Sequence, residues 1–470
     1  MNSSYTAYKL EYFLQWLPLK LIIGFFNPIN GKLSIDLINF CDGAVTSRRS
    51  RYFYCLIPFG YWIKVSKFRI NLLETIFLLS DALDLVGVDQ IYHSKRVAYL
   101  AAECGKALNW GQDRLDDLFF AAILHDCGVF KTAIHTKLTR FEANNVGNHC
   151  SMGSELLQRT PLLAYLSDYV LYHHTPWKEL MRFDLPYVVK IVANCIYMAD
   201  RVDILVLNGL EIDPNILGSK REIRKKIRAK RGSWFQPELV DIFLKLSKSE
   251  AFWLSLVKVP NAGYAYSGLE QNSIQEIEFE DLKSIVLIFS HIVDAKSTYT
   301  VKHSDGVADL SRFLGELFKL STHTCDMLEL AGLLHDLGML RVPDKILDKP
   351  GGLTESENFI VRRHSYDTYE ILKNIKGFED IAKWAAQHHE CIDGSGYPFR
   401  SHAKDLSIEA RIIAVADMFQ TLTQKRPYRD KFPPKDIMSI LKNQMQDGKL
   451  DKDVVLMVEK NLTACWKLAI

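Results

Sequence analysis

From Phe68 onward, apolar residues recur at the three- and four-residue spacing of amphipathic helices. After His303, for example, apolar residues follow at i+4, i+7, i+10, i+11 and i+14, which places them on one helical face with the histidine. Alternating patterns typical of strands are scarce, and glycine and proline cluster in 341–352 and 393–398, as in loops. The pattern predicts an all-α protein.

The helical pattern occurs twice along the chain. The segment IYHSKRVAYLAAECGKAL at 91–108 is similar to VKHSDGVADLSRFLGEL at 301–317, and further segments pair in the same order. In each copy two histidines lie 32 residues apart, and two later histidines lie 24 residues apart. They are His93, His125, His149 and His173 in the first copy, and His303, His335, His364 and His388 in the second. We therefore expect two tandem helical bundles related by an internal repeat.

Each copy carries five histidines and two aspartates at matched positions. The first set is His93, His125, Asp126, His149, His173, His174 and Asp200, and the second is His303, His335, Asp336, His364, His388, His389 and Asp417. A single histidine on an apolar helix face is usually a core residue, but the same set occurring twice favours metal binding. Imidazole and carboxylate suit Fe, Mn, Zn, Ni or Co, and seven ligands exceed the needs of one ion. An aspartate next to a liganding histidine can bridge two ions, which suits phosphate-ester cleavage.

Composition narrows the class of protein. The 470 residues include 58 Lys+Arg and 56 Asp+Glu, so the net charge of +2 argues against a DNA-binding protein. The 9 cysteines form no CxxC pair and indicate reduced thiols. The apolar stretches near the start are short and contain proline, so we expect no transmembrane segment, no signal peptide and a cytoplasmic location.

The second half resembles the HD-GYP family of metal-dependent phosphodiesterases. The resemblance runs from about Asp294 to Arg429 and includes YTVKHS, HDLG, VPDKILDKPGGLT, HHE with DGSGYP, and ARIIAVADMF followed by RPYR. The first half resembles an HD domain of the same lineage in which HHTPW stands where the GYP loop would be. The tandem arrangement is similar to bacterial proteins of which some act on cyclic dinucleotides, including the mixed GMP-AMP kind.

The resemblance implies a role for each matching residue. It implies two divalent metal ions in the second half (Fe, Mn or another transition metal), and metal in the first half as well. His335 and Asp336 would be catalytic, with Asp336 bridging the ions, and the two sets of seven residues named above would be the metal ligands. The implied substrate-binding residues are Arg426 and Arg429 of RPYR and Gly396, Tyr397 and Pro398 of the signature loop.

The sequence departs from the family pattern at several positions. The lysine that usually follows HDxG is Met339 in the second half and Val129 in the first. Many members carry aspartate three residues after the last ligand, where this chain has Gln420, although the first half keeps Asp203. Two cations lie two residues beyond the missing lysines and are candidate replacements: Arg341 and Lys131.

The expected organisation has four parts. They are an accessory or poorly ordered region at 1–67, an HD domain with a degenerate GYP loop at 68–257, a linker at 258–280 and an HD-GYP domain at 281–470. The segment 220–231, with eight basic residues, predicts an amphipathic helix.

The expected function is hydrolysis of a cyclic dinucleotide, c-di-GMP or cyclic GMP-AMP, to a linear product by a metal-bridged hydroxide. Two alternatives stay open: a catalytically weakened receptor for the dinucleotide, and a nucleotide phosphohydrolase acting through the first HD domain. A signalling protein partner or a homodimer is possible in each case.

Overall fold

The chain divides into two units, Met1–Lys64 and Val65–Ile470. The computed structural model describes residues 22–27, 32–37, 66–87, 92–142, 147–212, 215–258, 274–297, 302–425 and 430–470. In the first unit, β1 (Ile22–Asn27) pairs antiparallel with β2 (Lys32–Leu37). Most of the predicted accessory region at 1–67 lies outside the described residues. No helix of the described residues has the length and apolar character needed to cross a membrane.

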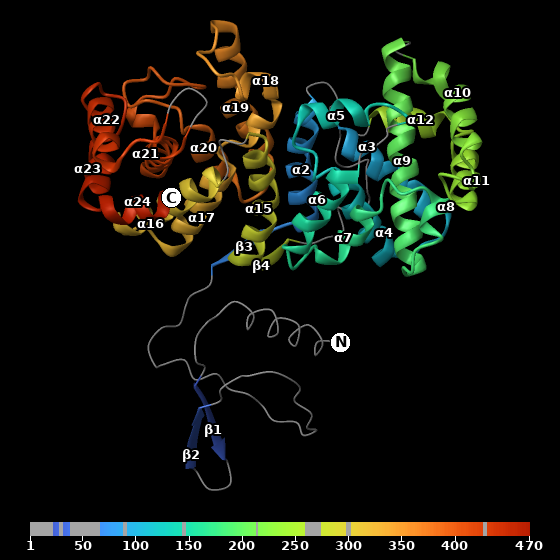
Figure 1. The fold of residues 1–470 in the computed structure, drawn as a ribbon, viewed down its shortest axis with the longest axis horizontal. Helices are drawn as coiled ribbons and strands as arrows, with labels where there is room; N and C mark the ends of the chain where they lie inside the picture. The colour runs from blue at the N-terminus through green and yellow to red at the C-terminus, as the bar shows by residue number, and fades with distance from the viewer. Residues whose placement is uncertain are drawn as a thin grey trace. The chain divides into compact units, whose positions relative to one another are not determined.

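The first half of the second unit is helical (Figure 1, blue to green). Its helices are α2 (Leu72–Leu79), η1 (Ser80–Gly87), α3 (His93–Ala107), α4 (Gln112–Leu124), α5 (Thr132–Leu138), α6 (Gly147–Gln158), η2 (Ala164–Leu166), α7 (Ser167–Leu171), α8 (Trp177–Leu180), α9 (Tyr187–Ile212), α10 (Ile216–Ala229), α11 (Pro237–Leu246) and α12 (Glu250–Lys258). The basic segment 220–231 lies largely in α10, whose Ile223 and Ile227 are buried, so the amphipathic helix is confirmed.

The second half repeats this arrangement (Figure 1, yellow to red). Its helices are α15 (Phe279–Ala295), α16 (His303–Leu317), α17 (Thr322–Leu334), η3 (Leu337–Arg341), α18 (Asp344–Leu347), α19 (Glu355–Leu372), α20 (Glu379–Ala386), η4 (Ala403–Asp405), α21 (Ile408–Thr423), α22 (Pro434–Gln446), α23 (Lys452–Lys460) and α24 (Leu462–Ala469). The prediction of two all-α bundles is confirmed.

In each half, a buried aspartate accepts hydrogen bonds from the start of the helix that carries the first ligand histidine. In α3 the backbone N–H and the hydroxyl of Ser94 donate to Asp84 Oδ1 at 3.3 and 3.1 Å. In α16 the hydroxyl of Ser304 donates to Asp294 Oδ1 at 2.7 Å. Burial, the largest cause, raises the pKa of each of these aspartates to about 6. These bonds satisfy donors at the helix start, where His93 or His303 is the first helical residue.

A small sheet and the hydrogen bonds of Thr132 with Asp344 join the halves. The strand β3 (Lys67–Ile70) pairs antiparallel with β4 (Gln275–Glu278), so part of the predicted linker 258–280 is a strand. Thr132 of α5 donates its backbone N–H to Asp344 Oδ2 at 2.9 Å, and the buried Lys296 lies 3.3 Å from Asp344 Oδ1. Residues 259–273 lie outside the described residues, and the domain boundaries stay a prediction.

A glycine packs the turn after each His-Asp pair against the helix of the next histidine. A Cβ on Gly338 would lie 2.1 Å from the carbonyl oxygen of His364, and one on Gly128 would lie 2.0 Å from that of His149. Because the contact is with backbone, no side chain can move aside to relieve it. The glycine therefore sets how closely these two parts of each site approach.

We expect Gly338→Ala and Gly128→Ala each to destabilise the protein by about 1–3 kcal/mol or more through overpacking. Thermal unfolding followed by circular dichroism would show a lower midpoint. Gly351→Ala is the matched control, because a Cβ there meets nothing within 4 Å. Midpoints equal to that of the control would contradict the close packing.

Candidate metal centres

Asp336 lies between two pairs of histidines in the second half. Its Oδ2 is 3.7 Å from His303 Nε2 and 3.5 Å from His335 Nε2. Its Oδ1 is 3.3 Å from His364 Nε2 and 3.8 Å from His388 Nε2. The two carboxylate oxygens therefore face different histidine pairs, which is the arrangement that a carboxylate bridging two ions requires.

The remaining two predicted ligands of the second half complete these groups. Asp417 Oδ1 lies 3.4 Å from His303 Nε2 and belongs to a group of ligand atoms with His303 and His335. His389 belongs to a second group with His364 and His388, and within each group the ligand atoms lie within 4.8 Å of one another. All seven predicted residues of this half come together.

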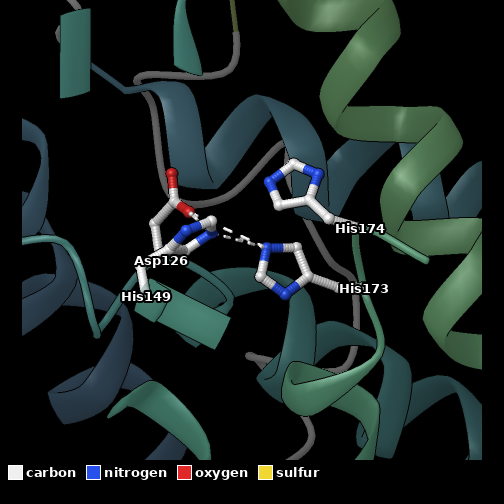
Figure 2. Close-up of side chains that lie close together, drawn as sticks. All are labelled: Asp126, His149, His173 and His174. Atoms are coloured by element: carbon white, nitrogen blue, oxygen red, sulfur yellow. Dashed lines mark hydrogen bonds and ion pairs between the residues drawn. The ribbon is translucent and has the colours of Figure 1, made fainter. Parts of the chain in front are cut away.

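The first half repeats this geometry around Asp126. Its Oδ2 faces His125 Nε2 at 3.4 Å and His93 Nε2 at 3.8 Å, and its Oδ1 faces His149 Nε2 at 3.5 Å and His173 Nε2 at 3.8 Å. Figure 2 shows Asp126, His149 and His173 converging, with His174 beside them. Asp200 completes the other group, 3.5 Å from His93 and 3.7 Å from His174.

Backbone carbonyls orient five of the ten imidazoles. In His125, His173, His335, His364 and His388 the Nδ1 atom lies 2.6–2.8 Å from the carbonyl oxygen three residues earlier. A carbonyl only accepts hydrogen bonds, so Nδ1 carries the proton and Nε2 presents its lone pair to the cluster. Metal-binding histidines in proteins are oriented in this way.

In the second cluster, the pKa shifts of three residues suit metal ligands. Burial, followed by the nearby histidines, lowers the pKa of His389 to about 4 and holds the pKa of His388 well below its ordinary value. Burial would raise the pKa of Asp336, but the histidines around it, His335 first, hold that pKa well below its ordinary value. Neutral imidazoles and ionised carboxylates are the forms that bind cations.

The first cluster also contains buried polar atoms that need a partner. His125 Nε2 and Asp126 Oδ1 have no hydrogen-bond partner within the described part of the chain. An unpaired buried donor or acceptor is costly, and a bound cation would satisfy both atoms. The residues present therefore fit a metal.

The signature loop lies against the second cluster. The ring of Tyr397 is 4.8 Å from that of His389, and Gly396 is so close to the preceding chain that a Cβ would lie 2.4 Å from Cys391 N. The carboxylate of Glu390 accepts hydrogen bonds from the three backbone N–H groups that follow Pro398. The loop is thus held beside the histidines, whereas Arg426 and Arg429 lie outside the described residues.

Both candidate replacements for the missing lysines, Arg341 and Lys131, already have a hydrogen-bond partner. Arg341 Nε donates to Asp367 Oδ2 at 2.8 Å, and Lys131 Nζ donates to the carbonyl oxygen of Lys296. Met339 packs partly buried against the hydrophobic core. The cation expected near the second cluster must therefore come from elsewhere.

Arg362 is a cation that the sequence analysis missed. Its guanidinium carbon lies 4.3 Å from the centre of the Tyr397 ring, and its side chain is exposed and makes no ion pair within the described residues. Its neighbour Arg363 is engaged with Asp367 at 3.3 Å. Helical periodicity gave no reason to place Arg362 at the site, because only the folding of the distant signature loop brings Tyr397 against it.

Comparisons with known proteins agree with this picture. Family models described as HD domain match residues 91–205 and 288–454. The chain is 36% identical over 409 residues to 3'3'-cGAMP-specific phosphodiesterase 1 of Vibrio cholerae serotype O1, covering 86% of this chain and 95% of that relative. It is 28% identical over 452 residues to phosphodiesterase 3 of the same specificity and organism, covering 85% and 96%.

Two further comparisons concern a shorter part of the chain and the fold. A cyclic di-GMP phosphodiesterase response regulator of Xanthomonas campestris is 34% identical over 161 residues, which is 34% of this chain and 42% of the regulator. A crystal structure of a cyclic GMP-AMP specific phosphodiesterase of V. cholerae matches with a TM-score of 0.57 at 22% identity, covering 85% of this chain and 98% of that one. The structural match supports the all-α tandem fold.

We expect Mn²⁺ to raise the thermal midpoint of chelator-treated protein, because an ion that binds only the folded clusters stabilises the folded state. The double variant Asp126→Ala/Asp336→Ala should lose most of this rise, whereas Asp380→Ala, at an exposed position of α20, should keep it. Differential scanning fluorimetry with metal analysis would measure both. An undiminished rise in the double variant would contradict the assignment of the bridging aspartates.

Proposed function

Because this chain belongs to the HD-GYP family of metal-dependent phosphodiesterases, we propose that its second half hydrolyses a cyclic dinucleotide to a linear product. Two full-length relatives act, by their names, on 3'3'-cGAMP, which favours cyclic GMP-AMP over c-di-GMP as the substrate. The observation that carries the proposal is the placement of Asp336, whose two oxygens face two separate histidine pairs.

The residues of the second centre divide into two ligand groups that share Asp336. His303, His335 and Asp417 would hold one divalent ion, and His364, His388 and His389 the other. Bound there, two ions of Fe, Mn or another transition metal would supply a hydroxide at neutral pH and stabilise charge on the phosphate.

The protein's own contribution is orientation and access. The carbonyl bonds to Nδ1 fix three of the five imidazoles before metal binds, so little reorganisation is needed. Four of the five histidines are buried, but the Asp336 side chain keeps 16% of its surface exposed, which leaves the bridging position reachable from solvent. Tyr397 contacts both the ring of His389 and the guanidinium of Arg362, which holds that cation beside the cluster.

Arg362 supplies a cation in place of the lysine that is replaced by Met339. A cyclic dinucleotide carries two phosphodiester groups, so when one lies at the metal centre the other must be held outside it. A guanidinium stacked on Tyr397 presents its N–H groups at the side, in the fork geometry that suits phosphate. We assign Arg362 to contact with the substrate's phosphate.

The first half has the ligands for a metal centre of its own and lacks the signature loop. A pocket of about 10 Å³, enough for about one water molecule and partly open to solvent, lies beside its cluster. The pocket is lined by Leu83, Asp84, His93, Ser94, Asp126, Val129 and His135. The complete ligand set of this half supports the second candidate function, a nucleotide phosphohydrolase acting through it. A cytoplasmic location and a protein partner or homodimer stay predictions.

Asp336→Ala removes a ligand from both ions of the second centre at once, so we expect cyclic GMP-AMP cleavage to be lost. Asp126→Ala should leave this cleavage largely intact, because only the second half carries the signature loop and Arg362. Product chromatography of metal-loaded protein would measure both variants. Cleavage that survives Asp336→Ala but not Asp126→Ala would reverse the assignment of the two halves.

Arg362→Gln should raise KM for cyclic GMP-AMP about tenfold or more, since a hydrogen bond to a charged group contributes about 1.5–3 kcal/mol. The rate on bis(p-nitrophenyl) phosphate, which has a single phosphate, should change little. Arg363→Gln is the matched control, because that side chain is engaged with Asp367. Equal KM values for the Arg362 variant and the parent protein would show that the guanidinium does not contact substrate.

A further inference from the structure

The two centres differ in the group that supports their first histidine. In the first half, His93 Nδ1 lies 2.7 Å from Asp203 Oδ2. Arg96 binds the same carboxylate through its Nε at 2.6 Å and a terminal nitrogen at 3.0 Å. Asp203 is fully buried, and Arg96 is 8% exposed. His93 is thus backed by a buried ion pair.

In the second half a neutral amide takes this position. His303 Nδ1 lies 2.6 Å from Gln420 Oε1, and Gln420 Nε2 donates to the carbonyl oxygen of Ala469 at 3.4 Å. Because the Ala469 carbonyl only accepts, the amide nitrogen faces it and the amide oxygen faces His303. The amide orientation therefore keeps the proton of His303 on Nδ1 and its Nε2 free for the cluster.

The replacement of aspartate by glutamine is accompanied by a second difference at a position that is its neighbour in space. Three residues after the first histidine, the first half has Arg96 and the second half has Gly306. A Cβ on Gly306 would lie 2.8 Å from the Cγ of Gln420. The longer glutamine thus occupies the space that an arginine side chain would need, so a charged pair in one half corresponds to a neutral pair in the other.

We propose that this exchange makes the second centre bind its metal more weakly than the first, so that the two centres load at different metal concentrations. A carboxylate that accepts from Nδ1–H makes the imidazole a stronger donor than an amide does, and such supporting groups typically change metal affinity by about 10- to 100-fold. The first centre then retains its metal, and the second responds to supply. The inference rests on the proposed metal centres and not on the reaction they catalyse.

Each centre can be measured separately in the full-length chain. Asp126→Ala leaves the second centre for titration, and Asp336→Ala leaves the first. In titrations with Mn²⁺ and a competing chelator, the dissociation constant of the second centre should be about 10- to 100-fold larger than that of the first. Asp203→Asn should weaken binding at the first centre, and the isosteric Gln420→Glu should tighten it at the second.

Two further variants distinguish the effect of a negative charge beside His303 from the effect of the same charge elsewhere on the protein. Gly306→Arg with Gln420→Asp rebuilds the ion pair of the first half and should also tighten the second centre. Gln446→Glu adds the same charge at an exposed site on α22 and should leave both affinities unchanged. Circular dichroism checks that each variant folds, since a glutamate at 420 places an oxygen near the Ala469 carbonyl.

The outcomes distinguish this inference from the proposed function. Equal Mn²⁺ affinities of the two centres, or an unchanged affinity in folded Gln420→Glu and in Asp203→Asn, would overturn the inference and leave the phosphodiesterase assignment standing. Absence of Mn²⁺ binding at both centres would overturn the metal centres themselves, and the inference with them.

Discussion

The structure of each half depends on keeping an ionised carboxylate among histidines that are mostly buried. Asp126 and Asp336 each contact four imidazoles, and an arrangement of this kind costs free energy unless every group is held in place or paired. Helix starts, backbone carbonyls and close glycine contacts fix the groups around it. The bundle therefore acts as a rigid frame whose facing helices place ligands that are far apart in the sequence.

The two halves share this frame and differ in what surrounds it. Around the second cluster lie the signature loop, Tyr397 and Arg362, in which the tyrosine ring supports an available cation. Around the first lie a small pocket and the ion pair of Arg96 with Asp203. A duplicated centre with two different surroundings is consistent with one half that cleaves a cyclic dinucleotide and another that acts on a smaller phosphate compound or serves regulation.

The sequence predicted the two bundles and the fourteen ligand candidates, which the structure places in two clusters. It could do so because helical periodicity and a repeated spacing together restrict where the side chains point. It did not predict Arg362, since that contact depends on how a distant loop folds back onto α19. Nor did it predict the strand pair of 67–70 with 275–278, because four residues are too few to show a periodic pattern. It identified Gln420 as a departure, but its partners His303 and Ala469 depend on tertiary packing.

The central claim is that Asp336 bridges two metal ions. Anomalous diffraction at the manganese edge from crystals of the Mn²⁺-loaded protein tests it most directly. The account predicts two peaks in the second half, about 3.5–4 Å apart, on opposite sides of the Asp336 carboxylate. A single peak, or peaks that Asp336 does not contact, would contradict it.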